Sequence, residues 1–253
     1  MTYQEALEQA RTCIGKCRAC PVCNGLACKN MVPGPGAKGL GTGAIRNYQK
    51  WQELCVNMDT ICENGDADTS YDFFGKKLTI PVMAGPVGAV TLHYSDKYDD
   101  LGYNNILVPG CAKAGILAFT GDGTNPAVME ATAAALKANG GCGVPTVKPW
   151  NLETIRHKMD LVKAADPCAI AMDIDAAGLP FLKGLNPPAG SKTVEQLKEI
   201  AAMAGKPFLL KGIMTVRPRR SPRRRPPLPE AGNAPAGKGG GRQRPVGAEN
   251  RLG

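Results

Sequence analysis

The chain has 253 residues and a formal net charge of +9 at pH 7, and this length suits one α/β barrel or two smaller domains. Residues 217–253 hold nine Arg, one Lys and two Glu, so they carry a net +8 and the rest of the chain only +1. Residues 1–216 therefore lack the excess charge that would indicate a nucleic-acid partner. The sequence shows neither a signal peptide nor an apolar run long enough to span a membrane, so a cytoplasmic protein is expected.

The N-terminal region, residues 1–77, contains two predicted helices and a cysteine cluster. Residues 1–12 have the composition of a short polar helix, and residues 44–58 repeat apolar side chains at helical spacing, as expected of a helix covering the floor of a barrel. Between them, residues 34–43 are rich in glycine. They are predicted to form a flexible loop rather than a phosphate-binding loop, because no strand precedes them and no Gly-Lys-Ser/Thr follows.

The cysteine cluster predicts a metal site. Thiolates two residues apart can turn onto one metal ion, which suits zinc or an iron–sulfur cluster. The predicted ligands are Cys17, Cys20, Cys23 and Cys28. No His lies nearby and the Cys-x3-Cys-Pro ending of bacterial ferredoxins is missing, so free structural thiols are the alternative. The ten cysteines and the lack of an export signal indicate a reducing compartment.

Residues 78–216 alternate predicted strands with predicted helices. The strands are expected at 78–84, 115–120, 143–148, 168–175 and 206–216, and three helices are expected to begin near Asn125, Asn151 and Ser191. Residues 104–115 are ambiguous, because Pro109 disfavours a helix interior. Alternation at this spacing implies right-handed βαβ units and a parallel sheet. The predicted fold is α/β, an incomplete TIM (β/α)8 barrel of about five βα units.

Charged residues stand at the ends of two predicted strands. Lys211 interrupts the apolar run that begins at Pro207. A buried ammonium needs a partner, and this end of a barrel strand is the active-site face, although a lysine that snorkels into solvent is the alternative. Asp173 and Asp175 end the fourth strand. They are candidates for a general-base pair, for metal ligands, or for a hydrogen-bonded cap on the following loop.

Two segments carry a family resemblance: Ile80–Gly88 and Pro207–Val216, the latter reading Pro-Phe-Leu-Leu-Lys-Gly-Ile-Met-Thr-Val. The chain, from about residue 13 to Val216, resembles the FMN-dependent α-hydroxy-acid oxidases and dehydrogenases, the glycolate oxidase and lactate oxidase family. The resemblance implies FMN as cofactor, a small α-hydroxy acid as substrate, and a lysine that stabilises the negative charge of the reduced ring. A homo-oligomer is compatible with it. The cofactor contacts implied are Ala84, Gly85, Pro86, Val87, Gly121, Thr146, Asp173 and Lys211.

The sequence also departs from that family. The Ser-Asn-His-Gly-Gly-Arg segment that carries the catalytic base has no counterpart, and the two histidines, His93 and His157, stand in other contexts. Thr146 and Lys148 stand roughly where the family has Gln and Tyr. No catalytic residue is therefore assigned, and the chain is interpreted as a truncated or frameshifted member that is inactive as written.

Residues 217–253 are rich in Arg, Pro and Gly and are expected to be disordered. They could form a basic tail that binds phosphates, or they could be an out-of-frame translation. The abrupt change inside a family motif favours the second interpretation, so nucleic acid is not expected as a partner. The alternative function is a cysteine-cluster metal or redox protein with a basic nucleic-acid-binding tail.

Overall fold

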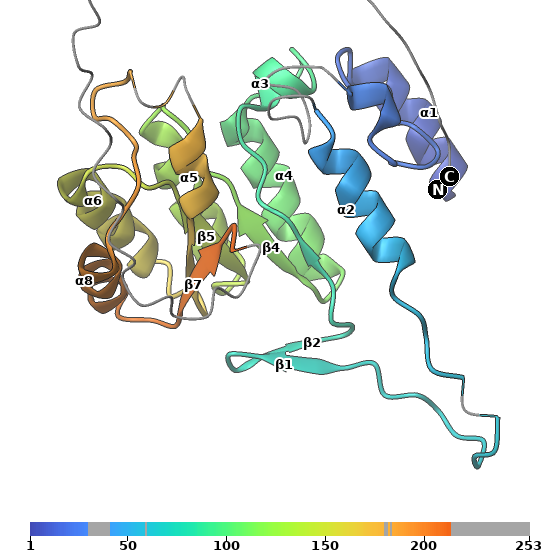
Figure 1. The fold of residues 1–253 in the computed structure, drawn as a ribbon. Coiled ribbons are helices and arrows are strands. Elements are labelled where there is room, and N and C mark those ends of the chain that lie inside the picture. Colours follow the sequence, from blue (N-terminus) through green and yellow to red (C-terminus); the bar gives the residue numbers. More distant parts are fainter. Residues whose placement is uncertain (30–40, 59, 180–181, 183, 214–253) are drawn as a thin grey trace, which may run out of the picture. The chain divides into compact units, whose positions relative to one another are not determined.

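The computed structural model describes residues 1–29, 41–58, 60–179, 182 and 184–213, all of which belong to one compact unit, Met1–Met214. The predicted disordered tail lies outside the described residues, and so does most of the predicted loop at 34–43. In chain order (Figure 1) the elements are α1 (Tyr3–Cys13), η1 (Leu26–Cys28), α2 (Gly43–Gln52), β1 (Tyr71–Phe73), β2 (Lys76–Leu78), β3 (Met83–Ala84), α3 (Val90–His93), α4 (Asp100–Lys113), β4 (Leu117–Thr120), α5 (Ala127–Ala138), β5 (Gly143–Val147), α6 (Leu152–Lys163), β6 (Ile170–Asp173), η2 (Ile174–Gly178), α8 (Val194–Ala204) and β7 (Phe208–Lys211).

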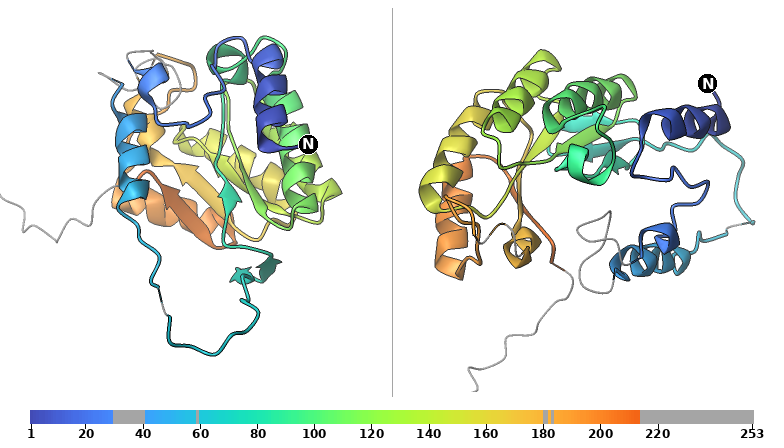
Figure 2. Two further views of the ribbon diagram at one scale, coloured as in Figure 1. Left: turned by 90° about the vertical axis from the view of Figure 1, so that its right-hand side faces the viewer. Right: turned by 90° about the horizontal axis from the view of Figure 1, so that it is seen from above.

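The main sheet has five parallel strands in the order β3-β4-β5-β6-β7, which is also their order in the chain. Because every crossover then runs in the same direction, right-handed connections put the helices on one side of the sheet. Helices α4, α5, α6 and α8 lie along that outer side (Figure 2). The predicted α/β fold with five βα units is thereby confirmed.

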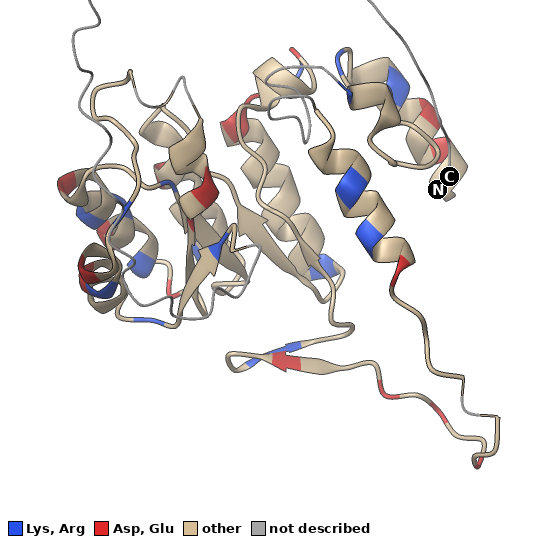
Figure 3. Cartoon of the chain, viewed as in Figure 1, with Lys and Arg blue, Asp and Glu red and all other residues tan. Residues whose placement is uncertain are grey.

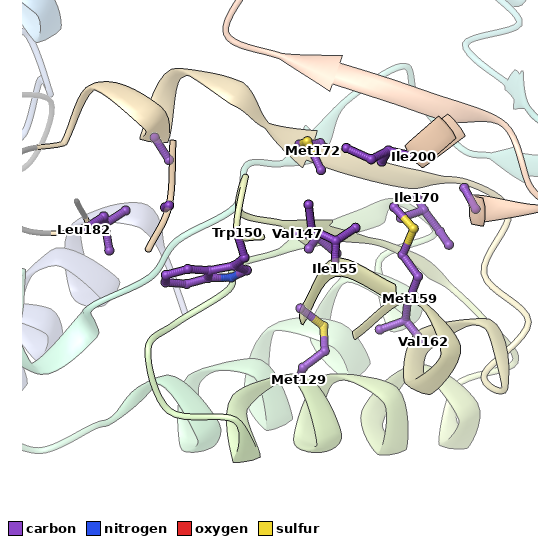
Figure 4. Close-up of a cluster of buried hydrophobic side chains, with 13 residues drawn as sticks. Met129, Val147, Trp150, Ile155, Met159, Val162, Ile170, Met172, Leu182 and Ile200 are labelled. Atoms are coloured by element: carbon purple, nitrogen blue, oxygen red, sulfur yellow. The ribbon is translucent and has the colours of Figure 1, made fainter. Parts of the chain in front are cut away.

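A large apolar core fills the space between the sheet and its outer helices. On α6, Ile155, Met159 and Val162 recur at helical spacing and are fully buried, because this face packs on the sheet. Figure 4 shows them converging with Ile170 and Met172 of β6. Burial of each such side chain contributes about 1.5–3 kcal/mol.

The inner face of the sheet carries a second cluster, which includes Leu117, Val144 and Ala171. The antiparallel hairpin β1–β2 packs Leu78 against this cluster, and Lys76 Nζ donates to the carbonyl of Gly140 at 2.8 Å, just before β5. The hairpin therefore covers the amino ends of the strands. The functional candidates lie at the opposite, carboxyl ends.

The predicted first strand at 78–84 is wrong in extent. Leu78 belongs to the hairpin, and only Met83–Ala84 pairs with β4. Pro81 has no backbone N–H to donate, and the Val82 N–H turns back to the Ile80 carbonyl at 2.8 Å. A continuous ladder from 78 to 84 is therefore interrupted before it reaches β3.

The structure settles the extent of three predicted helices. Helix α4 continues through Pro109, which resolves the ambiguity at 104–115 in favour of a helix. The helix predicted at 44–58 ends at Gln52 and contains no buried residue. It lies beside η1, where a Cβ on Gly25 would be 2.5 Å from the Ile45 nitrogen, so it does not cover the barrel floor. The last helix begins after Thr193 rather than at Ser191.

Lysines and arginines are interspersed with acidic residues over the described part of the chain (Figure 3), in keeping with its small net charge. Among the described residues, no helix is both long and apolar enough to cross a membrane.

Candidate functional site

Lys211, the last residue of β7, lies between two carboxylates. Its Nζ is 2.6 Å from Asp173 Oδ1 and 3.2 Å from Asp175 Oδ1. The register of the parallel pair β6–β7 makes Asp173 and Lys211 direct neighbours, so the two strand ends bring opposite charges together. The structure thus favours the paired lysine over one that snorkels into solvent.

Lys148, which follows β5, approaches the other oxygen of Asp173, with its Nζ 3.7 Å from Oδ2. Asp173 therefore faces two ammonium groups. The Asp173 side chain makes no capping hydrogen bond to η2. Among the described residues no three His, Cys, Asp or Glu side chains form a group that could hold a metal ion.

Burial and neighbouring charges shift the pKa values of Asp173 and Lys211. Burial raises the pKa of Asp173, and the hydrogen bond with Asp175 raises it further, against the opposing effect of Lys211 and Lys148. Burial lowers the pKa of Lys211, but the bonds and charges of Asp173 and Asp175 outweigh burial, so its pKa is raised overall. Lys211 is therefore a cation at neutral pH. The next residue must be glycine, because Gly212 has φ +100 and a Cβ there would be 2.7 Å from Asp175 Cβ.

Thr146 of β5 supplies a polar group without a partner. It is 2% exposed, it neighbours Ala171 of β6 in the register, and its Oγ1 has no hydrogen bond within the described residues. A buried hydroxyl left unpaired costs about 1–3 kcal/mol, so such groups usually have a partner. An unpaired hydroxyl at this edge of the inner face fits a bound polar ligand.

The ends of β3 and β4 meet backbone to backbone. A Cβ on Gly121 would be 1.9 Å from the Val87 carbonyl oxygen, so only glycine permits this approach. Ala84 packs partly against the outer helices, and nothing lies within 4 Å of a Cβ built on Gly85. Val87 lines a cavity beside α1.

The predicted cofactor residues therefore fall into two groups. Thr146, Asp173 and Lys211 come from neighbouring strands and are joined by Lys148, whereas Ala84, Gly85, Pro86, Val87 and Gly121 lie at the β3–β4 end of the sheet.

Sequence reasoning missed a buried ionic network next to this edge. The carboxylate of Asp122 accepts from Lys158 Nζ at 2.6 Å, from Trp150 Nε1 at 2.7 Å and from the Lys148 backbone N–H at 2.9 Å. Asp122 and Lys158 are 2% and 6% exposed, so the network ties the ends of β4 and β5 to α6 out of water. A signal existed: Lys158 stands on the apolar face of α6, beside Ile155 and Met159.

A cavity of about 620 Å³ in the described part of the chain does not coincide with the predicted site. It lies near the first turns of α5 and α6 and is lined by Pro126, Trp150 and His157, among others. None of the predicted cofactor residues lines it. The polar groups at the strand ends, and not this cavity, define the candidate site.

Neither histidine reaches the candidate site. His93 ends α3, where burial lowers its pKa and its Nδ1 has no partner among the described residues. His157 is exposed on α6. The structure therefore offers no imidazole to the Lys211 group.

The four predicted metal ligands do not form a metal site in the structure. Cys17, Cys20, Cys23 and Cys28 are free thiols, and the described residues contain no group of three or more metal-ligating side chains. Burial raises the pKa of Cys28, as does the proximity of the other three thiols. The thiols are thus near one another without a common centre, and a zinc or iron–sulfur site is not supported.

Comparisons with known proteins assign the family. The model of the FMN-dependent dehydrogenase family matches residues 35–181. The refolded wild-type lactate oxidase of Pediococcus acidilactici has a similar structure, with a TM-score of 0.57 and 18% identity, covering 84% of this chain and 60% of that chain. A monotopic membrane protein, (S)-mandelate dehydrogenase, gives a TM-score of 0.37 at 13% identity, over 62% of this chain and 40% of its own. No curated protein matches the sequence.

The family match covers more than half of the chain but ends before β7, and the chain spans about 60% of the length of the lactate oxidase. The likeness to that oxidase shows the fold, so the sheet β3–β7 is an incomplete (β/α)8 barrel. The resemblance found in the sequence is confirmed: this chain belongs to the FMN-dependent dehydrogenase family.

Proposed function

We propose that the chain binds FMN at the carboxyl ends of its strands and represents part of an α-hydroxy-acid oxidoreductase of the lactate or glycolate oxidase kind. The observation that carries this proposal is the unpaired buried hydroxyl of Thr146, on the strand next to the ion pair of Lys211 with Asp173. The family match supports the cofactor, and the fold supports a site at this end of the strands.

Each residue has a distinct part in this proposal. Thr146 would hydrogen-bond a polar edge of the ring, and Lys211 would place a cation where the ring gains negative charge. The close approach of Gly121 to Val87 leaves backbone rather than side chains at the β3–β4 end. When bound, FMN supplies the two-electron acceptor for oxidation of a hydroxy acid. The protein contributes orientation and charge.

We further propose that the chain as written does not oxidise hydroxy acids. General-base catalysis contributes about 10²–10⁴-fold to such reactions, and neither His93 nor His157 lies at the site. The carboxylates of Asp173 and Asp175 are engaged with Lys211, so they are poor substitutes for an imidazole.

The test separates binding from turnover. FMN is titrated into the full chain and its fluorescence followed, and lactate and glycolate are then assayed with a dye acceptor. FMN binding without turnover is expected, weakened about tenfold or more in Lys211→Ala through loss of a charge-assisted contact. Lys77→Ala, on the exposed face of the hairpin, is the matched control. If the unaltered chain does not bind FMN, the cofactor proposal is refuted. If the unaltered chain oxidises lactate or glycolate and Lys211→Ala does not, the proposed inactivity is refuted.

A second candidate function is a cysteine-cluster metal or redox protein with a nucleic-acid-binding tail. The observation in its favour is that Cys17, Cys20 and Cys23 lie near enough to Cys28 to raise the pKa of its thiol. The tail lies outside the described residues. Stoichiometric zinc or iron in the purified chain, together with heparin retention lost on deleting residues 217–253, would favour this candidate over the first.

A further inference from the structure

Cys13, the last residue of α1, forms a close pair with a lysine from a distant part of the chain. Its Sγ is 3.2 Å from Lys97 Nζ and 3.6 Å from Thr12 Oγ1. The pKa of Cys13 is lowered by the hydrogen bond with Thr12 and by Lys97, and the contact raises the pKa of Lys97. The single hydroxyl proton of Thr12 already goes to the Gln9 carbonyl at 2.7 Å, so the ammonium is the effective donor to sulfur.

Hydrogen bonds to the backbone hold the two residues together. The Ser95 hydroxyl donates to the carbonyl of Cys13 and accepts from the backbone N–H of Lys97 at 3.0 Å. Ser95 is only 3% exposed, and the Lys16 N–H donates to the neighbouring Tyr94 carbonyl at 2.8 Å. The pairing of Cys13 with Lys97 therefore does not depend on a flexible lysine side chain alone.

Cys13 borders a cavity that can hold a small molecule. The cavity has a volume of about 470 Å³ and includes Cys13 in its wall. The rest of the lining is mainly apolar or aromatic and includes Ala6, Ile14, Val90, Tyr94 and Ile106. A nucleophilic sulfur beside an apolar cavity is suited to a ligand that is both apolar and electrophilic.

We propose that Cys13 is a covalent modification site for apolar α,β-unsaturated carbonyl compounds that bind in this cavity. The thiolate forms a bond to the β-carbon, and the electron pair of the carbon–carbon double bond moves to the α-carbon. The Lys97 ammonium protonates the α-carbon and regains its proton from water. The addition is redox-neutral and needs no flavin, and of the predicted cofactor residues only Val87 lines this cavity.

Labelling kinetics of the reduced full chain at pH 7 test the proposal. N-phenylmaleimide is the apolar probe, iodoacetamide is the small polar probe, and Cys55, exposed in the same molecule, is the internal reference. With each probe the rate at each cysteine is read from its peptide by mass spectrometry. Cys13 should react severalfold faster than Cys55, because the Lys97 ammonium keeps a larger fraction of the Cys13 thiol as thiolate.

Variants at Lys97 and at Ala6 separate the effect of the charge from the effect of the cavity. Lys97→Met should remove the advantage of Cys13 with both probes and Lys97→Arg should keep most of it, whereas Lys113→Met, an exposed control on α4, should change nothing. Ala6→Phe should slow phenylmaleimide at Cys13 more than iodoacetamide. A Cys13 no faster than Cys55, or unaffected by Lys97→Met, overturns the reactive pair; an equal effect of Ala6→Phe on the two probes overturns the cavity.

Discussion

At the scale of single residues, the buried ion pair of Asp122 and Lys158 also fixes the neighbouring Trp150 and Lys148 by hydrogen bonds. Three donors converge on one carboxylate, and Lys158 Nζ also lies 5.6 Å from the ring centroid of Trp150. Removing one partner of a buried pair leaves the other charge in an apolar environment, and this lowers the stability of the fold more than loss of the attraction alone would.

Asp122→Asn and Lys158→Met are each expected to lower the free energy of unfolding by about 3–5 kcal/mol. The double variant should lose far less unfolding free energy than the two single variants lose together. It leaves no unpaired charge, and Asn still accepts from Trp150. Urea unfolding of the three variants gives the coupling energy. The exposed pair Asp160–Lys163, at 2.8 Å, is the control and should couple by less than about 1 kcal/mol. Additive losses in the buried pair would contradict this account.

At the scale of elements, caps decide where the helices begin. Asn151 accepts from the Thr154 N–H at 2.9 Å at the start of α6, as predicted. For α8 the capping residue is Thr193, which accepts from the Gln196 N–H at 3.2 Å, while the Gln196 side chain accepts from the Thr193 N–H at 2.9 Å. Ser191 also has a capping side chain, but it lies two residues too early for this reciprocal pair.

Thr193→Ala should therefore lower the free energy of unfolding by about 1 kcal/mol, because the first turn of α8 loses an acceptor. Ser191→Ala serves as the matched comparison and should change stability by no more than about 0.5 kcal/mol. Thermal or urea unfolding followed by circular dichroism measures both. Equal losses in the two variants would show that the helix start has been placed incorrectly.

At the scale of the whole molecule, the five-stranded sheet has two edges. Within the described residues, β3 and β7 each pair on one side only, whereas a barrel of this class closes with eight strands. Apolar side chains lie at these edges, among them Val82 at 53% exposure and Leu210 at 38%. Unpaired apolar edges favour association with other chains.

The proposed division into residues 1–77, 78–216 and 217–253 remains a prediction.

The full chain is accordingly expected to self-associate, with an average mass that rises with concentration in light scattering. Leu210→Lys should lower that mass, because a lysine on an edge strand opposes further pairing. Leu54→Lys replaces an equally apolar and more exposed side chain, at 69% exposure, away from the sheet. If Leu54→Lys is as effective as Leu210→Lys, or if the chain stays monomeric throughout, the edges are not the cause.

Much of the fold follows from the sequence alone. The apolar runs of β4 to β7, the cap of α6, and the position of Lys211 at a strand end are local properties, encoded within a few residues by periodicity and hydrogen-bonding capacity. The resemblance of the two strand-end segments to the flavin family was local in the same sense. The family match, over residues 35–181, includes Ile80–Gly88 and ends before Pro207–Val216.

The tertiary structure decided which of these residues meet. Lys211 and Asp173 are 38 residues apart, and Asp122 and Lys158 are 36 apart, so their contacts depend on strand register and helix packing rather than on spacing. The same holds for the hairpin that takes Leu78 from the first predicted strand, and for the cysteines whose spacing suited a metal. Local sequence sets the elements, because their hydrogen bonds close over a few residues. Partners across the sheet are set by the packing of the whole core, which no short segment contains.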